Sequence, residues 1–168
     1  MTPDDRIHDP IHRASYSFRR EGGNLWVMTW LEPGGHLPEH FHPSLEEHWE
    51  ALDGTVRVKL AGAWRDLTPE HGPIVVAPGV RHELQNAAGR EAHLRAEVIP
   101  GGRLEEFLTE SARAAREGLY DRRNLPTSLR GAVWIAGFAQ RFMDETVMCS
   151  PPPAVQRVVL PLVTRLAR

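Results

Sequence analysis

Apolar and polar side chains alternate through much of the first hundred residues. Residues 55–60 are typical, because Val56, Val58 and Leu60 share one face of an extended chain while the residues between them are polar. A strand with this pattern is half buried, as in an antiparallel sheet. Asp53-Gly54, just before it, is a strong hairpin signal. Turn signals recur at intervals of roughly ten residues, which predicts an all-β barrel or sandwich. They lie at residues 21–24, 33–35, 53–54, 61–62, 72–73 and 88–90.

The apolar period changes from two to 3.6 after Pro100, which predicts helices. The first is expected over residues 104–118 and the second over about 128–144. A third amphipathic helix is expected over 155–166, with a kink at Pro161. Their apolar faces are expected to pack against the barrel or a second copy of the chain. The leading residues on these faces are Phe107, Leu108, Val133, Phe142, Val159 and Leu162.

These patterns divide the chain into three parts. Residues 1–13 are polar and without period, and we expect a flexible N-terminal arm. Residues 14–100 are expected to form the β-barrel. Residues 101–168 are expected to form a C-terminal helical extension that packs on the barrel or on a dimer partner.

Composition favours one ordinary globular domain. The chain has 168 residues, of which 41% are hydrophobic and 25% charged, with a formal net charge of −2. A chain of this size buries about 70% of its unfolded surface. The charge argues against nucleic-acid binding, and no apolar run is long enough for a membrane-spanning helix. Cys149 is the single cysteine, and residues 4–6 are charged where a secretion signal would begin to be apolar. We therefore expect a cytoplasmic protein that binds a small molecule.

A cluster of histidines and one glutamate carries the chemistry. His40 and His42 lie two residues apart, so on a strand both imidazoles point to the same face. Glu47 can return to that point from the next strand, and the turn at Pro78-Gly79 delivers His82. Three imidazoles and one carboxylate would converge, which is a donor set for a divalent transition metal.

The spacing of these residues resembles the first motif of the cupin superfamily. That motif is a glycine, five residues, His-X-His, three or four residues, Glu, six residues and a glycine. It is met at Gly34, His40, His42, Glu47 and Gly54. The six-residue count to Gly54 favours Glu47 over the adjacent Glu46 as the ligand.

The second cupin motif is matched in part. Gly79, His82 and Asn86 fit, while Ala77 replaces the usual proline and the leading glycine is displaced to Gly72. Gly54 and Gly79 are expected to be turn residues, at least one of them with positive φ. The helical tail is similar to that of small bacterial single-domain cupins.

The cupin resemblance implies a double-stranded β-helix, a jelly-roll barrel that holds one divalent metal ion through His40, His42, Glu47 and His82. Iron, manganese, nickel, cobalt, copper and zinc all suit these donors. The first expectation for function is a dioxygenase-like oxidoreductase. The alternatives are a non-redox metal-dependent isomerase or cyclase, and a small-ligand-binding cupin without catalysis.

Further residues are candidates for the pocket. His36 has the same parity as His40, so it is expected either to line the pocket, as an acid or base, or to lie at its rim. The apolar residues Trp26, Met28, Trp30 and Trp49 are expected either to line the pocket or to belong to the barrel core. Cupin barrels commonly pair, so a homodimer is expected. Three arginines opposite the apolar face of the third helix leave association with a membrane surface as a weaker alternative.

Overall fold

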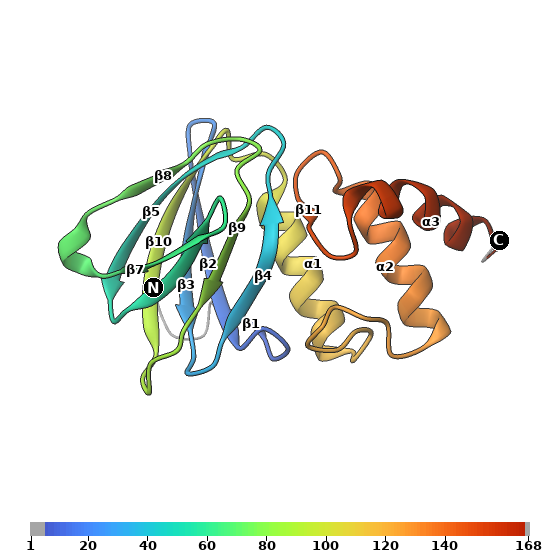
Figure 1. Ribbon diagram of the computed structural model, residues 1–168, viewed down its shortest axis with the longest axis horizontal. Coiled ribbons are helices and arrows are strands. Elements are labelled where there is room, and N and C mark those ends of the chain that lie inside the picture. The colour runs from blue at the N-terminus through green and yellow to red at the C-terminus, as the bar shows by residue number, and fades with distance from the viewer. Residues whose placement is uncertain (1–5, 167–168) are drawn as a thin grey trace.

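The computed structural model describes residues 6–166 and contains two antiparallel sheets that face each other, with the helices gathered at one end (Figure 1). The six-stranded sheet has the order β1-β2-β3-β10-β5-β8, and the five-stranded sheet has the order β11-β4-β9-β6-β7. The all-β fold with a helical extension, predicted from the alternation of side chains, is confirmed. The strands are β1 (Ile7–Asp9), β2 (Ala14–Glu21), β3 (Asn24–Leu31), β4 (His36–Phe41), β5 (Glu46–Asp53), β6 (Val56–Leu60), β7 (Ala63–Leu67), β8 (Ile74–Val76), β9 (His82–Gln85), β10 (Ala92–Ile99) and β11 (Val147–Met148).

The core lies between the two sheets, where the inward residues of each strand meet. In β6, Val56, Val58 and Leu60 are buried while Arg57 is exposed, as the alternation predicts. β10 contributes Leu94 and Val98 from the opposite sheet in the same way. Burial of such side chains contributes about 1.5–3 kcal/mol each, so the barrel has a core of its own that does not depend on a metal.

The Asp53-Gly54 turn differs from the expected hairpin. β5 belongs to the six-stranded sheet and β6 to the other, so this turn carries the chain from one sheet to the other. Gly54 has φ +77°, and a Cβ there would lie 3.1 Å from Ala92. The hairpin is instead formed by β6 and β7, joined at residues 61–62. The residues at 53–54 do form a turn, but the pairing of the strands is decided by the sheets that they join.

The N-terminal segment is more ordered than the expected flexible arm. Ile7–Asp9 form β1, which pairs with β2 at the edge of the six-stranded sheet, and Asp9 is buried. The first five residues of the expected arm lie outside the described residues. A strand of three residues is too short for a period to show in the sequence, which is why the sequence did not predict β1 in this segment.

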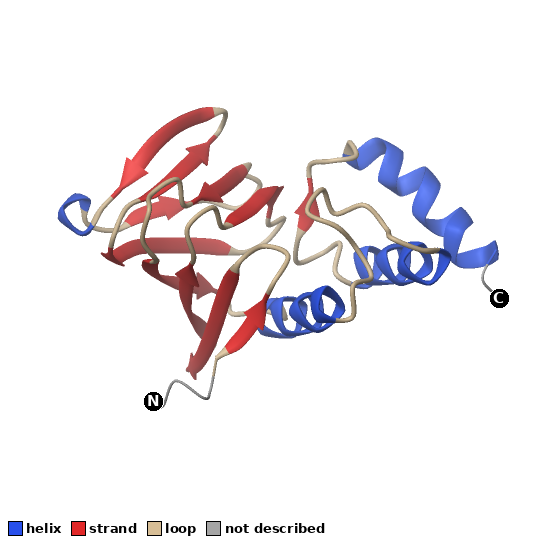
Figure 2. Cartoon of the chain, turned by 90° about the horizontal axis from the view of Figure 1, so that it is seen from below, coloured by secondary structure: helices blue, strands red, loops and turns tan. Residues whose placement is uncertain are grey.

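The three expected helices are present as α1 (Leu104–Arg116), α2 (Leu129–Arg141) and α3 (Pro153–Leu166). Gly118 follows α1 with φ +67°, and the Ser128 hydroxyl caps α2 by accepting the Gly131 N–H. The extension also returns to the barrel, because β11 pairs with β4. Figure 2 shows the helices beyond one end of the sheets. Residues of α1 and α2 line the same cavity as inward residues of the barrel.

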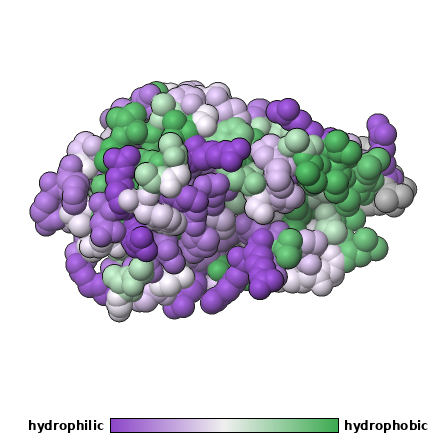
Figure 3. Space-filling model, viewed as in Figure 1, coloured by the Kyte–Doolittle hydropathy of each residue, from purple (hydrophilic) through white to green (hydrophobic). Residues whose placement is uncertain are grey.

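The apolar faces of the helices differ in how far they are buried. Phe142 is fully buried and Phe107 is half buried, but Val158, Val159 and Leu162 on α3 are exposed. Figure 3 shows a hydrophobic patch at the end of the molecule where α3 lies. Over residues 6–166 no helix has the length and apolar character needed to span a bilayer.

Candidate metal centre and cavity

Two histidines face each other across neighbouring strands. His40 in β4 and His82 in β9 are register partners, and their Nε2 atoms are 3.0 Å apart. A register shift between Leu37 and His40 turns His40 toward the barrel interior. The pair therefore depends on a β-bulge as well as on strand alternation.

His42 and Glu47 complete the cluster. Oε2 of Glu47 lies 3.5 Å from Nε2 of His42 and 3.4 Å from Nε2 of His82. The candidate ligand nitrogens of His40, His42 and His82 all lie within 4.8 Å of one another. Ligands bound at 2.0–2.1 Å are separated by about 3.0 Å at adjacent octahedral positions and by about 3.4 Å at tetrahedral ones. The structure thus brings the three predicted histidines together and places Glu47 beside two of them, His42 and His82.

Backbone carbonyls fix the orientation of all three imidazoles. Nδ1 of His40 donates to the Pro38 carbonyl at 2.7 Å, and Nδ1 of His82 donates to the Val80 carbonyl at 2.9 Å. Nδ1 of His42 donates to the Glu145 carbonyl at 2.8 Å. Because each Nδ1 carries the proton of the neutral ring, each Nε2 presents its lone pair to the same point.

Burial favours the neutral form of the three imidazoles, which is the form that can bind a metal ion. Burial lowers the pKa of His40 and of His42 to about 4. Burial, reinforced by the neighbouring His40 and His42, also places the pKa of His82 well below its ordinary value. Burial raises the pKa of Glu47 to about 7. Oε2 of Glu47 is buried and has no hydrogen-bond partner among the described residues.

Glu46 and Glu47 lie on opposite faces of β5, and this decides which of them is the candidate ligand. Glu47 points inward, whereas Glu46 points outward and accepts a hydrogen bond from His48 Nε2 at 2.7 Å. Glu47 therefore belongs to the cluster and Glu46 does not.

His36 lies outside the cavity, contrary to the pocket role considered for it. Its Nε2 is 2.7 Å from Oε1 of Glu83, and its side chain is 40% exposed. The bulge in β4 reverses the parity between His36 and His40, so the two histidines point to opposite faces although four residues separate them.

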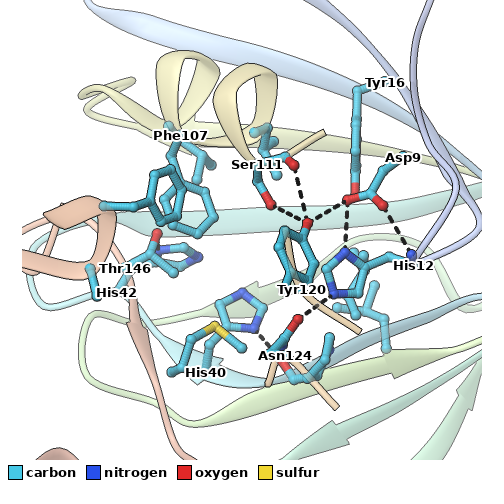
Figure 4. Close-up of a pocket in the computed structure, with 18 of the residues that line it drawn as sticks. Asp9, His12, Tyr16, His40, His42, Phe107, Ser111, Tyr120, Asn124 and Thr146 are labelled. Atoms are coloured by element: carbon cyan, nitrogen blue, oxygen red, sulfur yellow. Dashed lines mark hydrogen bonds and ion pairs between the residues drawn. The ribbon is translucent and has the colours of Figure 1, made fainter. Parts of the chain in front are cut away.

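A cavity of about 210 Å³ opens onto the cluster (Figure 4). His40, His42 and Glu47 lie on its wall, together with apolar residues of the barrel and of α1 and α2. Of the four candidate lining residues only Trp49 reaches it, and in β3 the inward residues are Val27 and Thr29. The residues of β3 that point inward are decided by how the strand sits in the sheet. The nearly continuous apolar run of β3 does not show which residues these are.

The other three candidates face away from the cavity. Trp26 lies beneath the guanidinium of Arg95, 5.3 Å from it, and Trp30 stacks on His93 with ring centroids 4.5 Å apart. Met28 alternates with the inward Val27 and Thr29 on the same strand. They are outer-face residues of the sheet.

Sequence reasoning missed a polar group on the cavity wall. Asp9, His12, Ser111, Tyr120 and Asn124 all line the cavity. They come from the N-terminal segment, from α1 and from the loop between α1 and α2. No periodic signal marks them, because segments far apart in the sequence bring them together. Figure 4 shows His12 held between Asp9 and Asn124, and Tyr120 hydrogen-bonded to Ser111.

The comparison with known sequences is limited. No protein-family model matches the chain. An oxidoreductase of Arthrobotrys oligospora is 33% identical over 65 residues, which are 39% of this chain and 26% of the relative. The chain thus spans about a quarter of the length of this curated relative.

The comparison with solved structures concerns the fold. A double-stranded β-helix protein of Klebsiella pneumoniae is similar with a TM-score of 0.51 and 20% identity, over 61% of this chain and 90% of that one. Peruvianin-I, a cysteine peptidase from the latex of Thevetia peruviana, is similar with a TM-score of 0.51 and 18% identity, over 61% and 76% of the two chains. The chain therefore has the double-stranded β-helix fold that the resemblance of its two motifs predicts. Likenesses at this level of identity extend no further than the fold.

Proposed function

We propose that the protein is a metal-dependent enzyme that holds one divalent transition metal ion through His40, His42, Glu47 and His82. The observation that carries the proposal is the cluster of three imidazole nitrogens within 4.8 Å of one another, with a buried carboxylate oxygen 3.5 and 3.4 Å from two of them. A metal ion supplies the partner that Oε2 of Glu47 otherwise lacks. The donor set of three nitrogens and one oxygen fits iron, manganese, nickel, cobalt, copper or zinc.

We further propose oxidation of a small organic molecule by dioxygen as the reaction. His40, His42, Glu47 and His82 would hold the metal ion, which would supply redox chemistry or Lewis acidity at the cavity wall. The chain's own residues bind the substrate in a cavity with mostly apolar walls, which excludes water from the reacting groups. The partial match to a protein described as an oxidoreductase supports oxidation over isomerisation.

Replacement of the two adjacent glutamates tests the metal centre. Protein purified without an affinity tag is expected to contain about one equivalent of metal by mass spectrometry. Glu47→Gln should lose most of it, because the neutral amide no longer balances the metal's charge. Glu46→Gln is the matched control, since Glu46 faces outward one residue away, and it should keep its metal. Equal metal content in both variants would contradict the proposed ligand set.

Dioxygen consumption then separates the possible reactions. Iron- or copper-loaded protein that consumes dioxygen with an organic substrate supports the proposed oxidation. Turnover without dioxygen would favour a non-redox isomerase or cyclase. Tight ligand binding without turnover would identify a binding protein.

A further inference from the structure

A second polar cluster lies on the wall of the same cavity and is built around His12. Nδ1 of His12 is 2.8 Å from Oδ2 of Asp9, whose other oxygen accepts the backbone N–H groups of Ile11 and His12 at 2.9 and 3.0 Å. The side chains of His12 and Asp9 are only 11% and 2% exposed. The carboxylate is thus buried with several donors, and it holds the imidazole in one orientation.

The environment of Asp9 keeps its charge. Burial by itself would raise the pKa of Asp9, but the hydrogen bonds from His12 and the backbone outweigh it, so this pKa lies below its ordinary value. A carboxylate at this position requires that Nδ1 of His12 carry a proton. Nε2 is therefore the atom of His12 that can exchange a proton with a ligand, and the Asp9 carboxylate stabilises the imidazolium that results.

Nε2 of His12 faces the side-chain amide of Asn124, with 3.1 Å to its Oδ1. A primary amide has both an acceptor oxygen and donor N–H groups, so it can satisfy Nε2 in either protonation state. Asn124 lies in the loop between α1 and α2, outside any helix or strand, with φ +58°. A ligand hydroxyl can take the place of this amide without breaking a regular element.

The neighbouring phenols remain neutral. The Tyr120 hydroxyl is 2.9 Å from the Ser111 hydroxyl, and burial raises the pKa of Tyr120. Burial also places the pKa of Tyr16 well above its ordinary value. Histidine is the side chain best suited to proton transfer near neutral pH, so within this cluster that role falls to His12.

The remaining walls indicate the kind of molecule that fits. No lysine or arginine lines the cavity within residues 6–166, so a phosphate or a dianion would find no cationic side chain of the usual kind there. Aromatic rings stack along one wall, with centroids 6.1 Å apart between Tyr120 and Trp134 and 4.6 Å apart between Trp134 and Phe138. Such a wall favours a flat apolar or aromatic body.

We propose that His12, held by Asp9, accepts the hydroxyl proton of a compact aromatic substrate bound in this cavity. The inference rests on the proposed function in placing the substrate there. In this step the substrate O–H bond breaks and its electron pair stays on the oxygen, while an N–H bond forms at Nε2 of His12. The proton returns to the product when it leaves, so His12 ends the cycle as it began.

The probe for this step is 4-nitrophenol, whose visible absorption changes when its hydroxyl ionises. Full-length protein is titrated with the probe at a pH where the free compound is protonated, once as purified or zinc-loaded and once after EDTA treatment. The wild type is expected to show the absorption of bound phenolate in both preparations. His12→Gln should lower the bound phenolate fraction about tenfold. His36→Gln is the matched control, because His36 points to the outer face, and it should behave like the wild type.

Each outcome decides the proposal. An unchanged phenolate signal in His12→Gln, or a wild-type signal that disappears with EDTA, would overturn the role of His12, because the metal would then ionise the probe. Absence of saturable binding would overturn the substrate class. If thermal melts show that His12→Gln is unfolded, Asp9→Asn decides instead: loss of the signal supports the proposal and an unchanged signal contradicts it. Metal content, measured separately, reports on the proposed metal centre without affecting these results.

Discussion

Oε2 of Glu47 lies 3.4 Å from Nε2 of His82, although the two residues belong to different sheets. Glu47 is on β5 of the six-stranded sheet and His82 is on β9 of the five-stranded sheet. The candidate metal centre therefore bridges the two layers of the barrel. A bound metal would tie the layers together and stabilise the native state by mass action.

Replacement of His82 by alanine should remove the metal and leave the barrel folded. The apolar core surrounds the site but does not require it, so we expect a loss of about 1–3 kcal/mol in unfolding free energy rather than collapse of the fold. Metal analysis and urea unfolding measure the two effects. His93→Ala is the control, because His93 stacks on Trp30 at the outer face, and it should retain the metal. Unfolding of His82→Ala would make the site a structural one.

Acidification should destabilise the metal-free protein. The folded-state pKa values of His40 and His42, about 4, lie below the ordinary 6.5, so the unfolded chain binds more protons between these values. The stability that these groups provide is present above pH 6.5 and is lost as the pH falls toward 4, and His82 acts in the same direction. Glu47 acts in the opposite direction between 4.5 and about 7, since its pKa is raised.

The destabilising effect of the three histidines should exceed the stabilising effect of the one glutamate. The urea concentration at the unfolding midpoint of EDTA-treated protein should therefore decrease as the pH is lowered from 6.5 to 4.5. His42→Gln should make this fall shallower, whereas His36→Gln should not change it. A midpoint that stays constant or rises on acidification would show that the histidines are not held neutral by burial. Added metal should raise the midpoint at pH 7, and this gain should vanish at acidic pH because protons compete for Nε2.

The grouping of the three candidate ligand histidines was predictable because it depends mainly on local geometry. Strand alternation places His40 and His42 on one face, and the Pro78-Gly79 turn positions His82. His36 shows the limit of this reasoning, since one bulge between Leu37 and His40 reversed its face.

The polar cluster around His12 was not predictable in the same way. Asp9 lies in a three-residue strand, and Asn124 in an irregular loop more than a hundred residues away. Only tertiary packing joins them. The outward orientation of Trp26 and Trp30 was not predictable for a similar reason. The apolar run in β3 has no alternation that shows which of its residues point inward.

Gly79 is expected to be needed for metal affinity as well as for stability. It has φ +79°, and its N–H donates to the His42 carbonyl at 2.8 Å, which ties the turn before His82 to another candidate ligand. Gly79→Val should destabilise the fold by about 1 kcal/mol or more through backbone strain, and it should weaken metal binding at least tenfold.

Gly62 provides the control for Gly79. It has φ +88°, and a side chain at either glycine would extend into open space, but Gly62 lies in the β6–β7 turn. Gly62→Val should therefore show a similar loss of stability without a loss of metal affinity, as measured by competition with a chelator. Equal metal affinity in the two variants would mean that the Gly79 turn does not position the ligands.

The exposed apolar face of α3 predicts a second copy of the chain as its partner. Val158 and Leu162 are 64% and 52% exposed, and they lie one turn apart with Val155 and Val159 beside them. Single exposed apolar residues are normal on the surface of a monomer, but a contiguous patch of four is not. Self-association would cover this patch. We expect a dimer in sedimentation experiments, and Val158→Asp should convert it to a monomer, since a buried carboxylate at the interface lacks a partner.

Val75→Asp is the control, because Val75 is similarly exposed but lies on β8 of the barrel. A dimer that survives Val158→Asp and dissociates with Val75→Asp would place the interface on the barrel, and a wild-type monomer that binds anionic vesicles would replace the dimer by a membrane surface.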